Sequence, residues 1–136
     1  MPEGVIFTVK YDKKFKRYCF ENDDILISVE CGQSQKNYAE NEVKRLLDWL
    51  RDKHDDFILK VSELFLEFAE NWDEWNHDRE YSPEEFAGSL YPDEIEVCAD
   101  GSFSICYESG LECLGEYRVF ADVSSDYALE DAGIIG

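Results

Sequence analysis

Long apolar runs are missing from this sequence of 136 residues, of which 33% are charged. No segment approaches the roughly 18 consecutive apolar residues that a membrane-spanning helix needs. Residues 1–10 also lack the basic start and the apolar core of a signal peptide. These absences predict a cytoplasmic protein that does not engage a membrane.

Cysteine lacks the spacing of a metal or redox motif. The chain has five cysteines, and no two of them form a Cys-x-x-Cys pair. We therefore expect reduced, partly buried thiols, with a disulfide framework or a metal site as the open alternatives. Phosphate-cradling glycine loops and the Gly-x-Ser-x-Gly motif of serine hydrolases are absent as well. No cofactor is predicted.

Cations are scarce, and most of the shortage lies in one half of the chain. The formal charge is −19, from 13 Lys and Arg against 32 Asp and Glu. Residues 1–60 hold 12 acids and 11 bases, whereas residues 61–136 hold 20 acids and 2 bases. Binding to a phosphate backbone or an anionic membrane requires clustered Lys and Arg. The charge therefore argues against nucleic acid and membrane as partners.

The sequence does contain enough apolar residues for a core. Hydrophobic residues make up 44% of the chain and aromatic residues 15%, which is too apolar for a disordered protein. The length fits one domain, and no linker rich in Pro, Gly or Ser divides it. We therefore expect a single domain over residues 1–136.

Hydrophobic periodicity divides the chain into strands, then helices, then strands. Alternating apolar residues predict three short strands in the first 30 residues, and helical spacing predicts two helices after them. A break at His54-Asp55-Asp56 separates these helices, although one kinked helix is the alternative. The expected elements are strands at 5–11, 15–20 and 25–30, helices within 39–50 and 58–72, and strands at 111–114, 117–122 and 128–135.

Two short motifs fix local structure. Ser82-Pro83-Glu84-Glu85 is a capping box with proline at the first helical position, so a short helix is expected from Pro83 to about Leu90. Asp100-Gly101 marks a hairpin turn. A three-residue loop places Val97 opposite Phe103 and Ile95 opposite Ile105, and this register gathers the apolar residues on one face.

The expected fold class is α+β. Three N-terminal strands and three to five C-terminal strands form a mainly antiparallel sheet. Two or three helices are inserted between them and pack on one face of that sheet.

A series of short motifs runs through residues 65–136. They are Trp72, 82–86 with Leu90, Ile95, 100–103, 108–110 and 131–136. In these positions the segment resembles an uncharacterised bacterial domain-of-unknown-function family, the one numbered twenty-two sixty-two, and its close relatives. The resemblance implies a small intracellular bacterial domain in the neighbourhood of toxin-immunity-like proteins, which constrains function poorly. The chain departs from the family at Cys113-Leu114-Gly115-Glu116, where the family has Phe-x-Gly-His, so a site built on that histidine is absent.

Histidine is rare, and its two positions offer little chemistry. Asp73 and His77 are one helical turn apart and could hold a divalent cation, although a solvated helix end is the simpler interpretation. His54 lies beside Asp55 and Asp56, which is typical of a surface residue near a helix end. The sequence therefore contains no identifiable catalytic residue.

The acidic second half also carries aromatic residues in a charged stretch. Trp75 and Tyr81 could be exposed binding anchors, or they could cover the core beneath a loop. The acids around them could face a basic partner or only aid solubility. The predicted partner-binding residues are Asp73, Glu74, Trp75, Asp78, Glu80, Tyr81 and Glu84.

Three functions compete at this point. The preferred one is a non-catalytic acidic binding protein, toxin-immunity-like, that engages a basic protein. The alternative is a small hydrolase or divalent-metal-dependent enzyme that uses a carboxylate and histidine cluster. A third is a structural or regulatory module that oligomerises through a sheet edge, and the sequence leaves the oligomeric state open.

Overall fold

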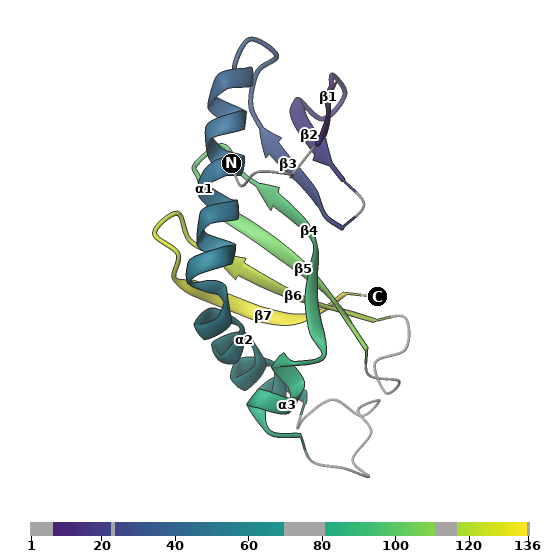
Figure 1. Cartoon of the computed structure of the whole chain (residues 1–136), viewed down its shortest axis with the longest axis vertical. Coiled ribbons are helices and arrows are strands. Elements are labelled where there is room, and N and C mark those ends of the chain that lie inside the picture. Colours follow the sequence, from purple (N-terminus) through teal and green to yellow (C-terminus); the bar gives the residue numbers. More distant parts are fainter. Residues whose placement is uncertain (1–6, 23, 70–80, 111–116, 136) are drawn as a thin grey trace.

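The computed structural model describes residues 7–22, 24–69, 81–110 and 117–135 (Figure 1). These residues form one seven-stranded sheet and three helices, with the connections between them. The order of these elements matches the predicted sequence of strands, helices and strands, whereas the strand predicted at 111–114 and the end of the helix predicted within 58–72 lie outside the described residues. Their bounds are β1 Thr8–Asp12, β2 Arg17–Glu21, β3 Leu26–Glu30, α1 Lys36–Asp52, α2 His54–Ala69, α3 Pro83–Ala87, β4 Leu90–Val97, β5 Phe103–Ser109, β6 Arg118–Val123 and β7 Leu129–Ile135.

The strands lie in the sheet in the same order as in the chain, from β1 to β7. All neighbouring strands are antiparallel except β3 and β4, which are parallel. A parallel pair needs a long crossover connection, and the three helices are part of this one. The α+β fold with a mainly antiparallel sheet is therefore confirmed.

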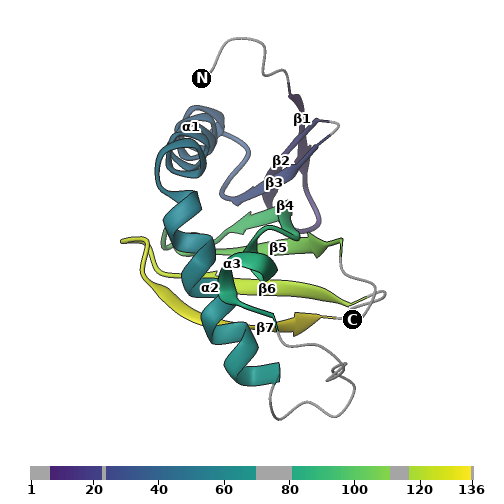
Figure 2. The same ribbon diagram turned by 60° about the horizontal axis from the view of Figure 1, so that its bottom comes forward.

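The helices cover one face of the sheet (Figure 2). α1 contacts β3 and α2 contacts β7, so the helical layer crosses from one part of the sheet to the other. The strand residues directed at this layer are apolar and buried. The largest fully buried side chains are Tyr107, Phe65, Phe86, Phe103, Ile27, Leu46, Ile95 and Ile105.

Two separate helices form where the alternative was one kinked helix. α1 ends at Asp52, and the backbone N–H of Lys53 still donates to the carbonyl of Trp49 at 2.8 Å. α2 begins at His54, with Asp55 and Asp56 in its first turn, where carboxylates favour the helix dipole. None of the three described helices is long and apolar enough to cross a membrane.

The capping box forms as predicted. Ser82 Oγ accepts from the backbone N–H of Glu85 at 3.1 Å, and Glu85 Oε1 accepts from the N–H of Ser82 at 3.3 Å. The helix is shorter than expected, however, because Leu90 already pairs with Ser109 as the first residue of β4. Pro92 is tolerated in this strand because the ladder is irregular between Pro92 and Glu94.

The predicted hairpin register is also confirmed. Val97 lies opposite Phe103, and Ile95 lies opposite Ile105. Gly101 has φ +89°, the left-handed conformation that the three-residue loop requires. The alternation of apolar and polar residues in this hairpin therefore predicts its buried face correctly.

Replacing the cap tests how much the start of α3 contributes to stability. Ser82→Ala leaves the N–H of Glu85 without its side-chain acceptor, and we expect the unfolding free energy to fall by about 1 kcal/mol. Urea denaturation followed by circular dichroism measures this difference. Ser34→Ala, at an exposed loop position, is the matched control and should change stability by much less. Equal losses in both variants would contradict the capping role.

Candidate functional site: the open face of the sheet

The face of the sheet that points away from the helices is here called the open face. Its residues follow from the strand register, because residues directly opposite in neighbouring strands point to the same side. One row across it contains Cys19, Ser28, Glu96, Ser104 and Asp122 from β2 to β6. In the part of the chain that the structure describes, no helix packs on this face (Figure 2).

Carboxylates dominate the open face. Eight Asp and Glu residues lie on it against three Lys and Arg residues, which makes it strongly acidic. The acids are Asp12, Glu21, Glu30, Glu94, Glu96, Glu108, Asp122 and Asp131, and the bases are Lys10, Arg17 and Arg118.

Both arginines of the open face are already paired with acids. Arg17 lies 3.5 Å from Glu96 and 3.9 Å from Asp12, and Arg118 contacts Asp93. Among the described residues, no cation pairs with Glu94, Asp122 or Asp131, although Asp122 accepts a hydrogen bond from Ser104 Oγ at 2.7 Å. The face therefore has uncompensated negative charge to offer.

Cys106 lies in the middle of this face and is not activated as a nucleophile. Burial raises the pKa of its thiol, Arg118 lowers it, and the neighbouring carboxylates Glu94, Glu96 and Asp93 raise it further. A thiol with a raised pKa stays protonated near neutral pH and reacts poorly. No group of three His, Cys, Asp or Glu residues within the described ranges could hold a metal ion.

An acidic hollow of about 300 Å³ opens where the β2–β3 turn meets β4. Its carboxylates come from the end of β2, from the turn and from the irregular part of β4. The lining residues are Glu21, Asn22, Asp24, Ile25, Leu26, Asp93 and Glu94.

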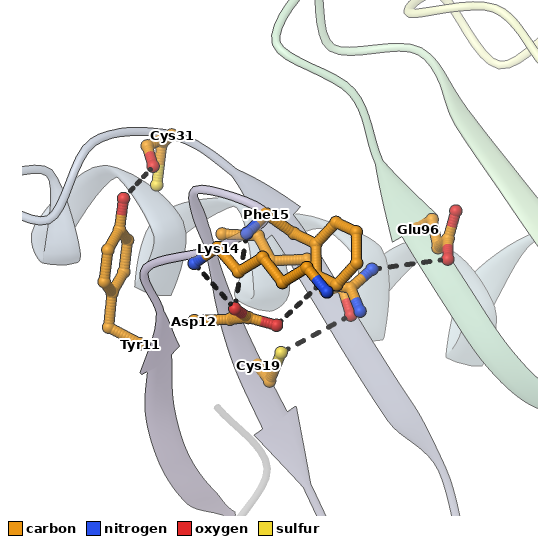
Figure 3. Close-up of polar contacts among 9 residues, drawn as sticks. Tyr11, Asp12, Lys14, Phe15, Cys19, Cys31 and Glu96 are labelled. Atoms are coloured by element: carbon orange, nitrogen blue, oxygen red, sulfur yellow. Dashed lines mark hydrogen bonds and ion pairs between the residues drawn. The ribbon is translucent and has the colours of Figure 1, made fainter.

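Exposed aromatic residues lie toward two ends of the open face. Tyr91, at the start of β4, is 52% exposed, and its hydroxyl donates to Glu108 Oε2 at 3.1 Å. Phe15, in the β1–β2 turn, is 59% exposed and lies with its ring 5.1 Å from the guanidinium of Arg17 (Figure 3). Such aromatics are the side chains that most often anchor protein interfaces.

The structure describes only two of the predicted partner-binding residues. Tyr81 is partly buried and packs against the core, so it does not stand out as an exposed anchor. Glu84 is exposed in the first turn of α3. The other predicted residues, including the candidate metal ligands, lie outside the described residues: Asp73, Glu74, Trp75, His77, Asp78 and Glu80.

The open face could not be predicted from the sequence because it depends on how distant strands pair. The alternation Glu94-Ile95-Glu96-Val97 was visible and shows one acidic face of one strand. Placing Asp122 or Arg17 beside it requires the order of the sheet, which local patterns do not contain.

The prediction that His54 lies at the surface is wrong. The residue is 8% exposed, and its Nε2 lies 2.8 Å from the hydroxyl of Tyr107 on β5. Its ring also stacks on the Tyr107 ring at 5.6 Å and meets Trp49 edge-on at 5.7 Å. His54 therefore joins the start of α2 to a central strand, on the opposite side of the sheet from the open face.

A second polar clamp holds two hairpin turns against α1. Arg45 Nη1 donates to the hydroxyl of Tyr127 at 2.5 Å, and Arg45 Nη2 donates to the carbonyl of Gly101 at 3.4 Å. Tyr127 has φ +69° and stacks on Trp49 at 5.4 Å. Two hollows of about 450 and 350 Å³ flank Tyr127 beside α2, and both are lined by Phe57, Lys60 and Tyr127.

Comparisons with protein-family models, with curated proteins and with solved structures found no match. The resemblance of residues 65–136 to the bacterial domain-of-unknown-function family therefore stays a prediction.

The buried histidine makes stability depend on pH. Burial lowers the pKa of His54 below the 6.5 of an ordinary histidine, although Asp55 opposes this shift. The folded state therefore binds the proton more weakly than the unfolded state. The contribution of His54 to the unfolding free energy is fully present above pH 6.5 and is lost as the pH falls through the folded pKa.

We expect the unfolding free energy to fall below about pH 6.5 with a slope of at most about 1.4 kcal/mol per pH unit from this group. Chemical denaturation at about pH 7.5 and about pH 5.5 measures the fall. His54→Gln should remove most of this fall in unfolding free energy. The variant keeps His77, so any contribution of that second histidine remains and serves as an internal control. An equally steep fall in the variant would show that other groups are responsible.

Proposed function

We propose that this protein is a non-catalytic binding protein whose open face docks on a basic protein partner. The observation that carries the proposal is the excess of carboxylates on a sheet face that no described helix covers, where both arginines are already paired with acids. Complementary charge steers association and selects partners. Phe15 and Tyr91 supply exposed aromatic surface at this face.

The chemistry of the face also indicates the kind of partner. Uncompensated carboxylates such as Glu94 and Asp131 favour lysine and arginine side chains on the opposing protein. A basic nuclease toxin carries such side chains, which makes a cytoplasmic, immunity-like role the function that agrees with the family resemblance. This chain would then neutralise the toxin by covering the toxin's basic surface, since binding needs no chemistry from this chain.

The enzyme alternative receives no support from the described residues. It requires a histidine that faces two or more carboxylates in an accessible site. His54 is buried against Tyr107 and therefore does not supply that cluster.

Neutralising the open face tests the docking surface directly. The triple variant Glu94→Gln, Glu96→Gln, Asp122→Asn removes three negative charges from this face, and we expect it to lose basic proteins that the original chain retains from a lysate of its own cells. The same proteins should dissociate at about 1 M NaCl, where the screening length falls to about 3 Å.

A matched control distinguishes the effect of the open face on binding from the effect of the overall net charge. Glu40→Gln, Glu63→Gln and Glu67→Gln remove the same charge from exposed positions on α1 and α2, and this variant should keep the captured proteins. Equal loss in both triple variants would show that net charge, and not the open face, governs binding. Retention in both would overturn the proposed function.

Exposed aromatics at the same face allow a second, uncharged test. Tyr91→Ala removes a ring that is 52% exposed, and we expect the affinity for a captured partner to fall about tenfold or more if the ring is an anchor. Isothermal titration with the purified partner measures the change. Phe68→Ala, which removes a 40% exposed ring on α2, on the helix side of the sheet, should leave that affinity unchanged.

A further inference from the structure

β1 is an edge strand with an open side. It pairs with β2 alone among the described strands, and the sheet order ends with it. Val9, in its middle, is 38% exposed although it points to the helix side of the sheet. An unpaired strand edge offers free backbone N–H and C=O groups to another strand.

The two ends of the β1–β2 hairpin carry opposite charges. The turn after Asp12 holds Lys13, Lys14 and Lys16, followed by Arg17. At the other end, Thr8 lies opposite Glu21, which lines the acidic hollow together with Asp24. The β1–β2 hairpin therefore runs from an acidic end to a basic end.

The basic end is held in a fixed shape (Figure 3). Asp12 Oδ1 accepts from the backbone N–H groups of Lys14 at 3.0 Å and Phe15 at 3.3 Å. The centroid of the Phe15 ring lies 5.4 Å from Lys14 Nζ and 5.1 Å from Arg17 Cζ. Lys16 has φ +52°, a conformation that non-glycine residues rarely adopt. A turn ordered in this way loses little entropy when it meets a partner.

We propose that a second copy of this chain pairs with β1 in antiparallel orientation, about a two-fold axis at Val9. Antiparallel pairing places the basic end of each hairpin beside the acidic end of the other. Two sheets of seven strands would then join into one continuous sheet. The surface involved is distinct from the centre of the open face, so this proposal does not depend on the proposed function.

The register follows from the side chains of β1. A two-fold axis perpendicular to the sheet must place one residue opposite its own copy. At Lys10 it would bring two like charges together, which is destabilising. At Val9 it places Val9 opposite Val9, Phe7 opposite Tyr11, and Lys10 opposite Thr8 of the other copy. Apolar residues then face apolar residues on the helix side.

This register also brings Lys10 toward a carboxylate of the other copy. Thr8 lies opposite Glu21 within each chain, so Lys10 and the second copy's Glu21 are separated by two strand spacings, about 9–10 Å between Cα atoms. The long side chains of lysine and glutamate can span this distance. The two-fold axis makes the pair twice.

Local neutrality and screening limit the repulsion that the large net charge adds to this contact. Residues 7–31 contain five Lys or Arg and five Asp or Glu, so the hairpin region is neutral although the chain carries −19. Charges further away than a Debye length, about 8 Å at physiological ionic strength, are largely screened.

The other sheet edge lacks this complementarity. β7 carries Glu130 and Asp131 and no base, so self-pairing there would gather charges of one sign. α2 also packs on β7. β1 is therefore the edge that fits a second copy.

Sedimentation velocity from micromolar to several hundred micromolar protein tests the dimer. At physiological salt we expect the original chain to shift from monomer to dimer with concentration. Lys10→Glu should weaken the dimer about fivefold to tenfold, since it opposes Glu21 at two symmetric places. The double variant Lys10→Glu, Glu21→Lys should restore it. Lys44→Glu, at an exposed position on α1, should leave it unchanged.

Cross-linking tests the register. Val9→Cys places two thiols opposite each other at a Cα separation of about 4.5–5.5 Å, within the range of a disulfide. Oxidation should give a dimer linked at position 9, located by peptide mass spectrometry because the chain has five native cysteines. A chain that stays monomeric at all these concentrations overturns the proposal. So does a dimer that tolerates Lys10→Glu and forms no link at position 9.

Discussion

The parallel pairing of β3 with β4 is the constraint on which the rest of the structure depends. Every other neighbouring pair of strands is antiparallel and joined by a short connection. This one pair requires the chain to cross over the sheet, and the crossover contains all three described helices. Because the crossover lies on one side, the apolar strand residues are buried there and the polar ones gather on the open face. The acidic surface is thus a consequence of where the helices are inserted.

The features that could be predicted from the sequence are those set by residues close together along the chain. The Ser82 capping box and the Ile95–Ile105 pairing were predicted because each is fixed within a dozen residues. The β3–β4 pairing joins Ile27 to Ile95, and no local pattern encodes that contact. His54 was misplaced because its acidic neighbours suggested a surface position, whereas its partner Tyr107 is 53 residues away. Leu90 has the spacing of a helical residue, but its pairing with Ser109 makes it the start of a strand.

The charge of the protein takes a different meaning once the sheet is known. In the sequence, the negative charge belongs to residues 61–136. In the structure, acids from both halves share the open face, because β2 and β3 contribute Glu21 and Glu30 beside Glu94 and Glu96 of β4. The basic turn after β1 lies at the rim of that face. A partner therefore meets an acidic centre with one basic corner, which gives it an orientation as well as an attraction.

The clamp formed by Arg45 has a consequence for the order of folding. Its guanidinium reaches Gly101, 56 residues away, and Tyr127, 82 residues away. Contacts of such long sequence separation become favourable only after the intervening chain has closed, because closure costs entropy before the contact forms. We therefore expect the clamp to form late in folding, once the β4–β5 and β6–β7 hairpins have brought their turns close to α1. Its formation then ties the helical layer to two turns of the sheet.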